Sequence, residues 1–156
     1  MRQQTGRRAG VGVAILVAMV IGGVSCRSAS PKAEFQERAN TICRDMKAKG
    51  DAVSGPAATA SDANALPAVF RQMKDVVDDA VRQLRALTPP PGDETTVTGA
   101  IDALERSAQT TAALADVAAK DPTTMQAAVK AQADAQVASD AAMTAYGLTD
   151  CVFGSA

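Results

Sequence analysis

Residues 66–92 read LPAVFRQMKDVVDDAVRQLRALTPPPG and contain the clearest periodic signal in the chain. Apolar side chains recur three and four residues apart over six turns, which is typical of one face of an amphipathic helix: Leu66, Val69, Phe70, Met73, Val76, Val77, Ala80, Val81, Leu84 and Leu87. The three consecutive prolines at 89–91 then end the helix, because proline lacks the amide proton that a helix interior needs. The segment predicts a long helix over 62–87, with Ser61 or Asp62 as its N-cap.

A shorter helix is predicted before this segment, over 31–49. Ser30 is a suitable N-cap, and Pro31 fits the first helical position, where a missing amide proton costs nothing. The apolar stripe of this helix has spacings of four, three and four residues and consists of Phe35, Ala39, Ile42 and Met46. Gly50 is a typical helix end, and the small residues of 50–61 predict a loop.

Two more helices are predicted after the prolines. Asp93 and Glu94 place negative charge where a helix N-terminus favours it, so a third helix is expected over 93–120. Asp121-Pro122 begins a fourth over 122–146, which ends at Gly147. The chain of 156 residues is rich in Ala and has only 3% aromatic residues, a composition that favours helices over β sandwiches and barrels. We therefore predict an all-α antiparallel four-helix bundle over residues 31–156.

The N-terminus has the form of an export signal. Arg2, Arg7 and Arg8 precede an uncharged apolar stretch over 9–24, and small residues follow up to Cys26. This is the pattern of a secretory signal peptide, predicted over 1–25. The apolar run is short for a permanent membrane anchor, which is the alternative.

The end of this segment, Val24-Ser25-Cys26, resembles the lipobox of bacterial lipoproteins, with Gly23 where that motif usually has Leu. The resemblance implies that Cys26 is lipidated and becomes the mature N-terminus, with 26–30 as a tether. It also implies that the chain is anchored in the cell membrane by lipid, on the extracytoplasmic face.

The three cysteines, at positions 26, 43 and 151, are an odd number. If Cys26 carries lipid, Cys43 and Cys151 remain as a pair in a compartment that permits disulfides. In an antiparallel bundle the fourth helix ends near the start of the first, so the tail must run back along the first helix. The four residues from Gly147 to Cys151 reach at most about 14 Å. The sequence predicts a Cys43–Cys151 disulfide, and the alternative is two buried thiols that never meet.

Few residues in this chain can carry out catalysis. There is no His, which removes the commonest general base and most zinc and haem ligands. The remaining candidates are carboxylates in two clusters: Asp75, Asp78 and Asp79, and Asp102 and Glu105. Asp78 precedes Arg82 and Asp102 precedes Arg106 by four residues, the spacing of ion pairs on a solvated helix face. We therefore expect no catalytic residue, no metal site, no cofactor and no enzymatic activity.

Two further groups of residues are candidates for a binding site. Polar residues on the third and fourth helices either line a groove for a small ligand or form outer faces: Thr110, Thr111, Thr123, Thr124, Gln126, Gln132 and Gln136. Four methionines on apolar stripes are expected to fill the core rather than bind copper: Met46, Met73, Met125 and Met143. Tyr146 is expected to close one end of the bundle with its hydroxyl at the surface.

Three motifs resemble those of a group of small secreted or lipid-anchored helical proteins of actinobacteria. They are Ala39-Asn40-Thr41-Ile42-Cys43-Arg44, Leu84-Arg85-Ala86-Leu87-Thr88-Pro89-Pro90 and Tyr146-Gly147-Leu148-Thr149-Asp150-Cys151. The resemblance implies an exported bundle with a disulfide and no established activity.

The functional expectation is a membrane-tethered, non-enzymatic module whose partner is an unidentified envelope protein or small ligand. One alternative is a carrier of an apolar small molecule or lipid, which needs an apolar cavity beside the Ala-rich helices. Another is a hydrolase that uses carboxylates alone, which needs two inward acids about 5–10 Å apart. The net charge of −1 argues against a nucleic-acid partner.

Overall fold

The computed structural model describes residues 30–59, 65–117 and 122–153. The predicted signal peptide, Cys26, the tether up to residue 29 and the predicted caps Ser61 and Asp62 lie outside these ranges.

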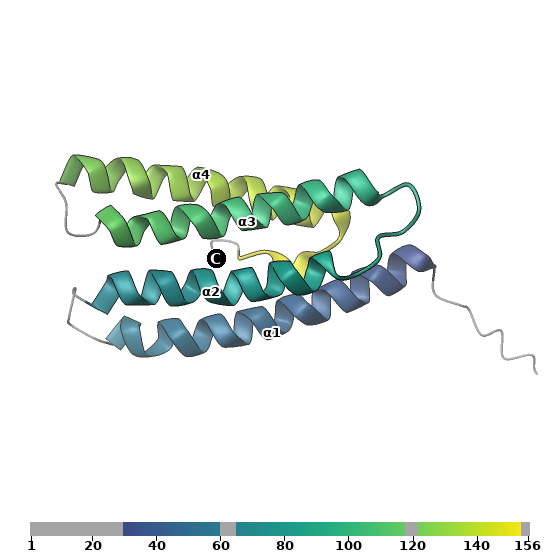
Figure 1. Cartoon of the computed structure of the whole chain (residues 1–156), viewed down its shortest axis with the longest axis horizontal. Helices are drawn as coiled ribbons and strands as arrows, with labels where there is room; N and C mark the ends of the chain where they lie inside the picture. The colour runs from purple at the N-terminus through teal and green to yellow at the C-terminus, as the bar shows by residue number, and fades with distance from the viewer. Residues whose placement is uncertain (1–29, 60–64, 118–121, 154–156) are drawn as a thin grey trace, which may run out of the picture.

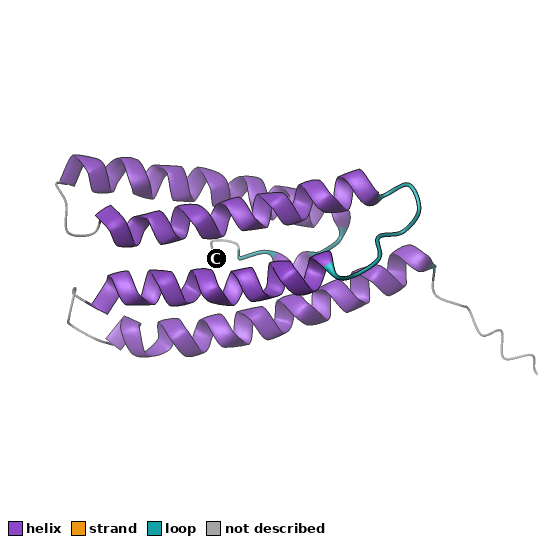
Figure 2. Ribbon diagram, viewed as in Figure 1, coloured by secondary structure: helices purple, strands orange, loops and turns teal. Residues whose placement is uncertain are grey.

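The described chain forms four long helices and one short one, with no strand in these ranges (Figures 1 and 2). They are α1 (Pro31–Thr59), α2 (Leu66–Arg85), α3 (Glu94–Val117), α4 (Pro122–Tyr146) and the 3₁₀ turn η2 (Thr149–Cys151). Successive long helices run in opposite directions (Figure 1). The predicted all-α antiparallel four-helix bundle is confirmed.

Helix α1 begins as predicted but continues ten residues further than expected. The Ser30 hydroxyl accepts a hydrogen bond from the amide of Ala33 at 3.2 Å, so Ser30 is the N-cap. The prediction that this helix ends at residue 49 is wrong, because α1 runs through Gly50 to Thr59. Gly50 is buried beside the Met73 sulfur of α2, so packing between the two helices overrides the low helix propensity of glycine.

The C-terminal tail closes the bundle. Each long helix packs against the next one in sequence, while η2 packs against both α1 and α4 (Figure 1). Gly147, with φ +85°, turns the chain out of α4. The amides of Leu148 and Gly147 donate to the carbonyls of Met143 at 2.9 Å and Thr144 at 3.0 Å, the hydrogen-bond pattern of a glycine-terminated helix. This turn directs the tail between α1 and α4, where η2 contacts both helices.

The apolar core occupies the half of the bundle nearest the disulfide. It includes α1 over 35–46, α2 over 77–84, α3 over 97–108 and the end of α4 with the tail. Towards the other end large apolar side chains are less buried: Leu66 is 41% exposed and Val129 is 49% exposed. The helices are therefore packed tightly at one end and more loosely at the other.

Candidate functional site

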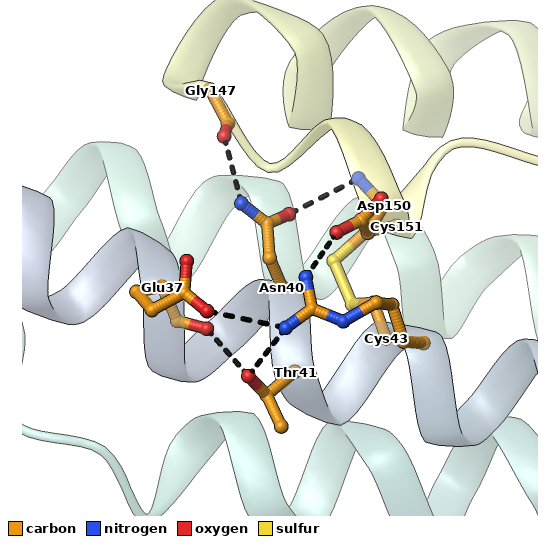
Figure 3. A network of polar contacts seen from close by, with 8 residues as sticks. Glu37, Asn40, Thr41, Cys43, Gly147, Asp150 and Cys151 are labelled. Atoms are coloured by element: carbon orange, nitrogen blue, oxygen red, sulfur yellow. Dashed lines mark hydrogen bonds and ion pairs between the residues drawn. A yellow bond between two sulfur atoms is a disulfide. The ribbon is translucent and has the colours of Figure 1, made fainter.

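The predicted disulfide is present and joins α1 to the tail (Figure 3). Cys43 and Cys151 are fully buried, with their Cα atoms 4.8 Å apart, which lies within the range that a disulfide requires. The tail runs back along α1, as predicted from the antiparallel order of the helices. The alternative of two separate thiols is thereby excluded.

Polar side chains of α1 hold the backbone of the tail on both sides of this bond. The Asn40 side chain donates to the carbonyl of Gly147 at 3.3 Å and accepts from the amide of Asp150 at 3.1 Å (Figure 3). Gln36 donates to the carbonyl of Tyr146 at 2.6 Å, and Lys47 donates to that of Val152 at 3.1 Å. We call these α1 side chains the tail clasp: Gln36, Asn40, Arg44 and Lys47. Three of them, Gln36, Asn40 and Lys47, pair with backbone groups at the end of α4 and in the tail that have no partner within a helix.

Arg44 is the charged member of the tail clasp. Its guanidinium pairs with Asp150 at 2.6 Å and with Glu37 at 3.2 Å, and it also donates to the Thr41 hydroxyl at 2.8 Å. The hydrogen bond to Asp150, followed by that to Glu37, raises the pKa of Arg44 above its ordinary value. The Cys-Arg and Asp-Cys pairs seen in the sequence thus serve to fasten the tail.

Tyr146 lies at the same end of the bundle, and its hydroxyl is not at the surface as the sequence predicted. The residue is 3% exposed, and its hydroxyl donates to Asp93 at 2.8 Å. Lys32 pairs with Asp93 at 3.2 Å and sits 4.5 Å from the centre of the tyrosine ring, and Phe35 packs edge-on against that ring at 5.9 Å. The prediction failed because Asp93 comes from the connection after α2, a contact that local spacing does not reveal.

These contacts shift the pKa values of both groups. Burial, followed by the hydrogen bond to Asp93, raises the pKa of Tyr146 to about 12. The hydrogen bonds from Tyr146 and Lys32 lower the pKa of Asp93. The arrangement stabilises a neutral phenol beside an ionised carboxylate, so Tyr146 is a poor proton donor and acceptor near neutral pH.

The carboxylate clusters are surface ion pairs, but their partners differ from those predicted. Asp78 pairs with Lys74, one turn earlier, instead of Arg82. Arg85 of α2 reaches across to Asp102 at 2.8 Å and to Glu105 at 2.7 Å. The predicted pairing of Asp102 with Arg106 is therefore replaced by a contact between helices.

The other acids of the first cluster are also at the surface. Asp79 pairs with Arg82 and with Lys49 at 3.2 Å, and the hydrogen bond from Lys49 lowers the pKa of Asp79. Asp75 is exposed. No group of three or more His, Cys, Asp or Glu residues that could hold a metal ion occurs in the described ranges.

A pocket of about 210 Å³ lies where α2, α3, α4 and the end of the tail meet. Five apolar side chains form most of its lining: Met73, Val77, Leu104, Ala108 and Phe153. Of the methionines singled out in the sequence, Met46 and Met143 are fully buried in the core, Met125 is half-buried, and only Met73 lines this pocket.

Polar side chains from the predicted groove line one side of this pocket. Thr111, Gln132 and Gln136 meet there, together with Ser107 and Lys74. The remaining members of the predicted set, Thr110, Thr123, Thr124 and Gln126, do not line it. The sequence analysis did not identify Phe153 and Lys74 as members of this site. The only sequence signal for Phe153 was the apolar pair Val152-Phe153 directly after Cys151, which the disulfide holds in place.

Hydrogen bonds hold the polar side of the pocket in place. The Gln136 side chain accepts from the Ser107 hydroxyl at 2.9 Å and donates to Asp140 at 2.8 Å. The backbone amide of Phe153 donates to the same Asp140 oxygen at 3.0 Å. Asp140 thus joins α4 to the tail beside the pocket.

No protein-family model, no curated protein and no solved structure matches this chain. Among the helices that the structure describes, none is long and apolar enough to cross a membrane. Cys26, the predicted lipidation site, lies outside the described residues.

Proposed function

We propose that this chain is an extracytoplasmic lipoprotein in which lipidated Cys26 holds the helical bundle at the outer face of the cell membrane. The disulfide between Cys43 and Cys151 carries the proposal, because such bonds persist in oxidising compartments outside the cytoplasm. It uses two of the three cysteines and leaves Cys26, at the end of a signal-like segment, for lipid.

The bundle itself is proposed to act as a non-enzymatic binding or structural module. The acids that a carboxylate hydrolase would need lie at the surface in ion pairs, and the one tyrosine hydroxyl is occupied by Asp93. The polar groups of the tail clasp are engaged in holding the tail against α1. These contacts support a structural scaffold and do not support acid–base chemistry.

Metabolic labelling with a fatty acid tests the anchor. The wild-type chain should incorporate the label and fractionate with membranes, whereas Cys26→Ala should remain unlabelled. The matched control is the double variant Cys43→Ala/Cys151→Ala, which removes the other two thiols and should keep the label. Equal labelling of wild type and Cys26→Ala would show that the lipid is not on this residue.

A carrier of an apolar small molecule or lipid is the second candidate function. The observation that favours it is the apolar pocket beside α3 and α4. A pocket of about 210 Å³ is below the 300–1,000 Å³ usual for drug-sized ligands. A full lipid tail would therefore require the helices to separate, while a smaller molecule would not.

A further inference from the structure

The pocket between α2, α3, α4 and Phe153 has the size of a site for a small organic molecule. Its volume is about 210 Å³, while an engineered apolar cavity of about 150 Å³ in another protein stays dry and binds benzene. A molecule of one or two small rings therefore fits without separation of the helices.

The charges around the pocket favour an uncharged molecule. Lys74 is the cationic residue of the lining, and its ammonium group already pairs with Asp78. Asp140 is outside the lining, where one of its oxygens accepts hydrogen bonds from Gln136 and from the amide of Phe153. A charged ligand would lose its hydration in a mainly apolar lining whose cationic residue is already paired, which is unfavourable.

One amide side chain of the lining makes no hydrogen bond to the described part of the chain. The Gln136 amide is committed to Ser107 and Asp140, and the Thr111 hydroxyl donates to the carbonyl of Ser107 at 3.0 Å. The half-buried side chain of Gln132 has no hydrogen-bond partner within the described ranges. A side-chain amide offers both donors and an acceptor, so it can pair with a single polar group on a bound molecule.

We propose that this pocket binds an uncharged, mainly apolar molecule of one or two small rings, with one hydrogen-bonding group that pairs with Gln132. The apolar side of the molecule contacts Val77, Leu104 and Ala108, and Phe153 forms the wall at the tail. This inference rests on the proposed binding function and names the site and the ligand class.

Indole is a suitable probe for this pocket. It has an apolar body and one N–H donor, and its fluorescence has no tryptophan background because the chain contains no Trp. The titration uses the exported chain in phospholipid vesicles, which add no second protein. Partitioning of indole into lipid is the same for every variant and is subtracted.

Two pairs of variants separate binding in the pocket from other effects. Ala108→Leu fills the pocket and should abolish saturable binding, while Ala113→Leu adds the same group at an exposed position of the same helix and should not. Gln132→Leu removes this amide and should raise the Kd about fivefold, the effect of one hydrogen bond. Gln109→Leu, at an exposed position, should leave the Kd unchanged.

The wild-type chain should give a saturable fluorescence change that follows this pattern. The proposal would be overturned if the wild type gave no saturable change. It would also be overturned if Ala108→Leu and Gln132→Leu both bound indole as tightly as the wild type. Tighter indole binding by a chain that ends at Phe153 would also overturn it, by identifying residues 154–156 as the natural occupant. The same titration with Cys26→Ala keeps the test separate from the anchor, because failure of lipidation would leave indole binding intact.

Discussion

At the scale of single residues, Asn40 shows how one amide side chain serves two backbone groups. It donates to the carbonyl of Gly147 and accepts from the amide of Asp150, so it bridges the turn after α4 and the middle of η2. Neither Asp nor Leu can replace it fully, because Asp in its ionised form lacks the donor and Leu lacks both groups. The motif around Cys43 therefore specifies the path of the tail.

Tyr146 and Asp93 predict a specific pH dependence. The pKa of Tyr146 is raised to about 12, so its contribution to stability is complete below its usual pKa of 10.0 and is lost as the pH rises through about 12. The pKa of Asp93 is lowered from 3.8, so its contribution is complete above that value and is lost as the pH falls below it.

The single tyrosine makes the alkaline half of this prediction directly measurable. Tyrosinate absorbance reports Tyr146 alone, because the chain has one Tyr and no Trp. We expect a titration midpoint near 12 in the wild type and a lower midpoint in Asp93→Asn, which removes the carboxylate charge. An unchanged midpoint in Asp93→Asn would assign the whole shift to burial.

Gly147→Ala should destabilise the bundle by about 1–3 kcal/mol, because φ at this position is +85° and strains any L side chain. The added methyl group would also come within 2.5 Å of the Gln36 amide nitrogen and so disturb the tail clasp. Chemical denaturation measures the loss.

Two other glycines serve as controls for this substitution. Gly92→Ala meets the same strain, with φ +89°, but no neighbour within 4 Å, so it separates strain from crowding. Gly99→Ala lies within α3 with free space around it and should stabilise the helix by about 0.5–1 kcal/mol. A Gly147→Ala variant as stable as the wild type would contradict the assigned role of this turn.

At the scale of secondary structure elements, the Gly50→Ala variant tests whether α1 extends through Gly50. The test is whether the substitution raises or lowers the free energy of unfolding. Gly50→Ala should raise the free energy of unfolding by about 0.5–1 kcal/mol, because alanine is favoured over glycine within a helix. The new methyl group would lie 3.4 Å from the Met73 sulfur, an ordinary contact distance, so it causes no clash. If the helix ended there with a positive φ, the same change would destabilise the protein. Denaturant unfolding of the variant distinguishes the two cases.

The elements that the sequence predicted well are those defined by local chemistry. The cap at Ser30, the stop at Gly147 and the bounds of α4 follow from the residues at those positions. The continuation of α1 past Gly50 could not be predicted in this way, because it depends on the contact between Gly50 and Met73 of α2.

The candidate site was less predictable than the helices. The sequence suggested Thr111, Gln132 and Gln136 as groove residues but offered no means to bring them to Met73 or Phe153. The partners of Asp102 and Tyr146 are also on other elements. Helical periodicity places a residue on a face of its own helix and leaves open what that face meets.

At the scale of the whole molecule, the disulfide should contribute much of the stability. It closes a loop with a sequence separation of 108, for which the chain-entropy model gives up to about 4–5 kcal/mol. Cys43→Ala/Cys151→Ala, or reduction, should lower the melting temperature clearly but leave helical signal at low temperature, because the packing of α2 on α3 remains. An unchanged melting temperature on reduction would contradict this expectation.

The position of the disulfide also determines how the molecule responds to cutting. All three connections between the long helices lie between Cys43 and Cys151 in the sequence, so the disulfide closes these connections and the helices between them into one covalent ring. A protease that cleaves one peptide bond in any of these connections opens the ring without dividing the molecule. The nicked chain should migrate as one species on a non-reducing gel and as two after reduction. A single cut between helices therefore frees no fragment, and whatever holds the N-terminus still holds every helix.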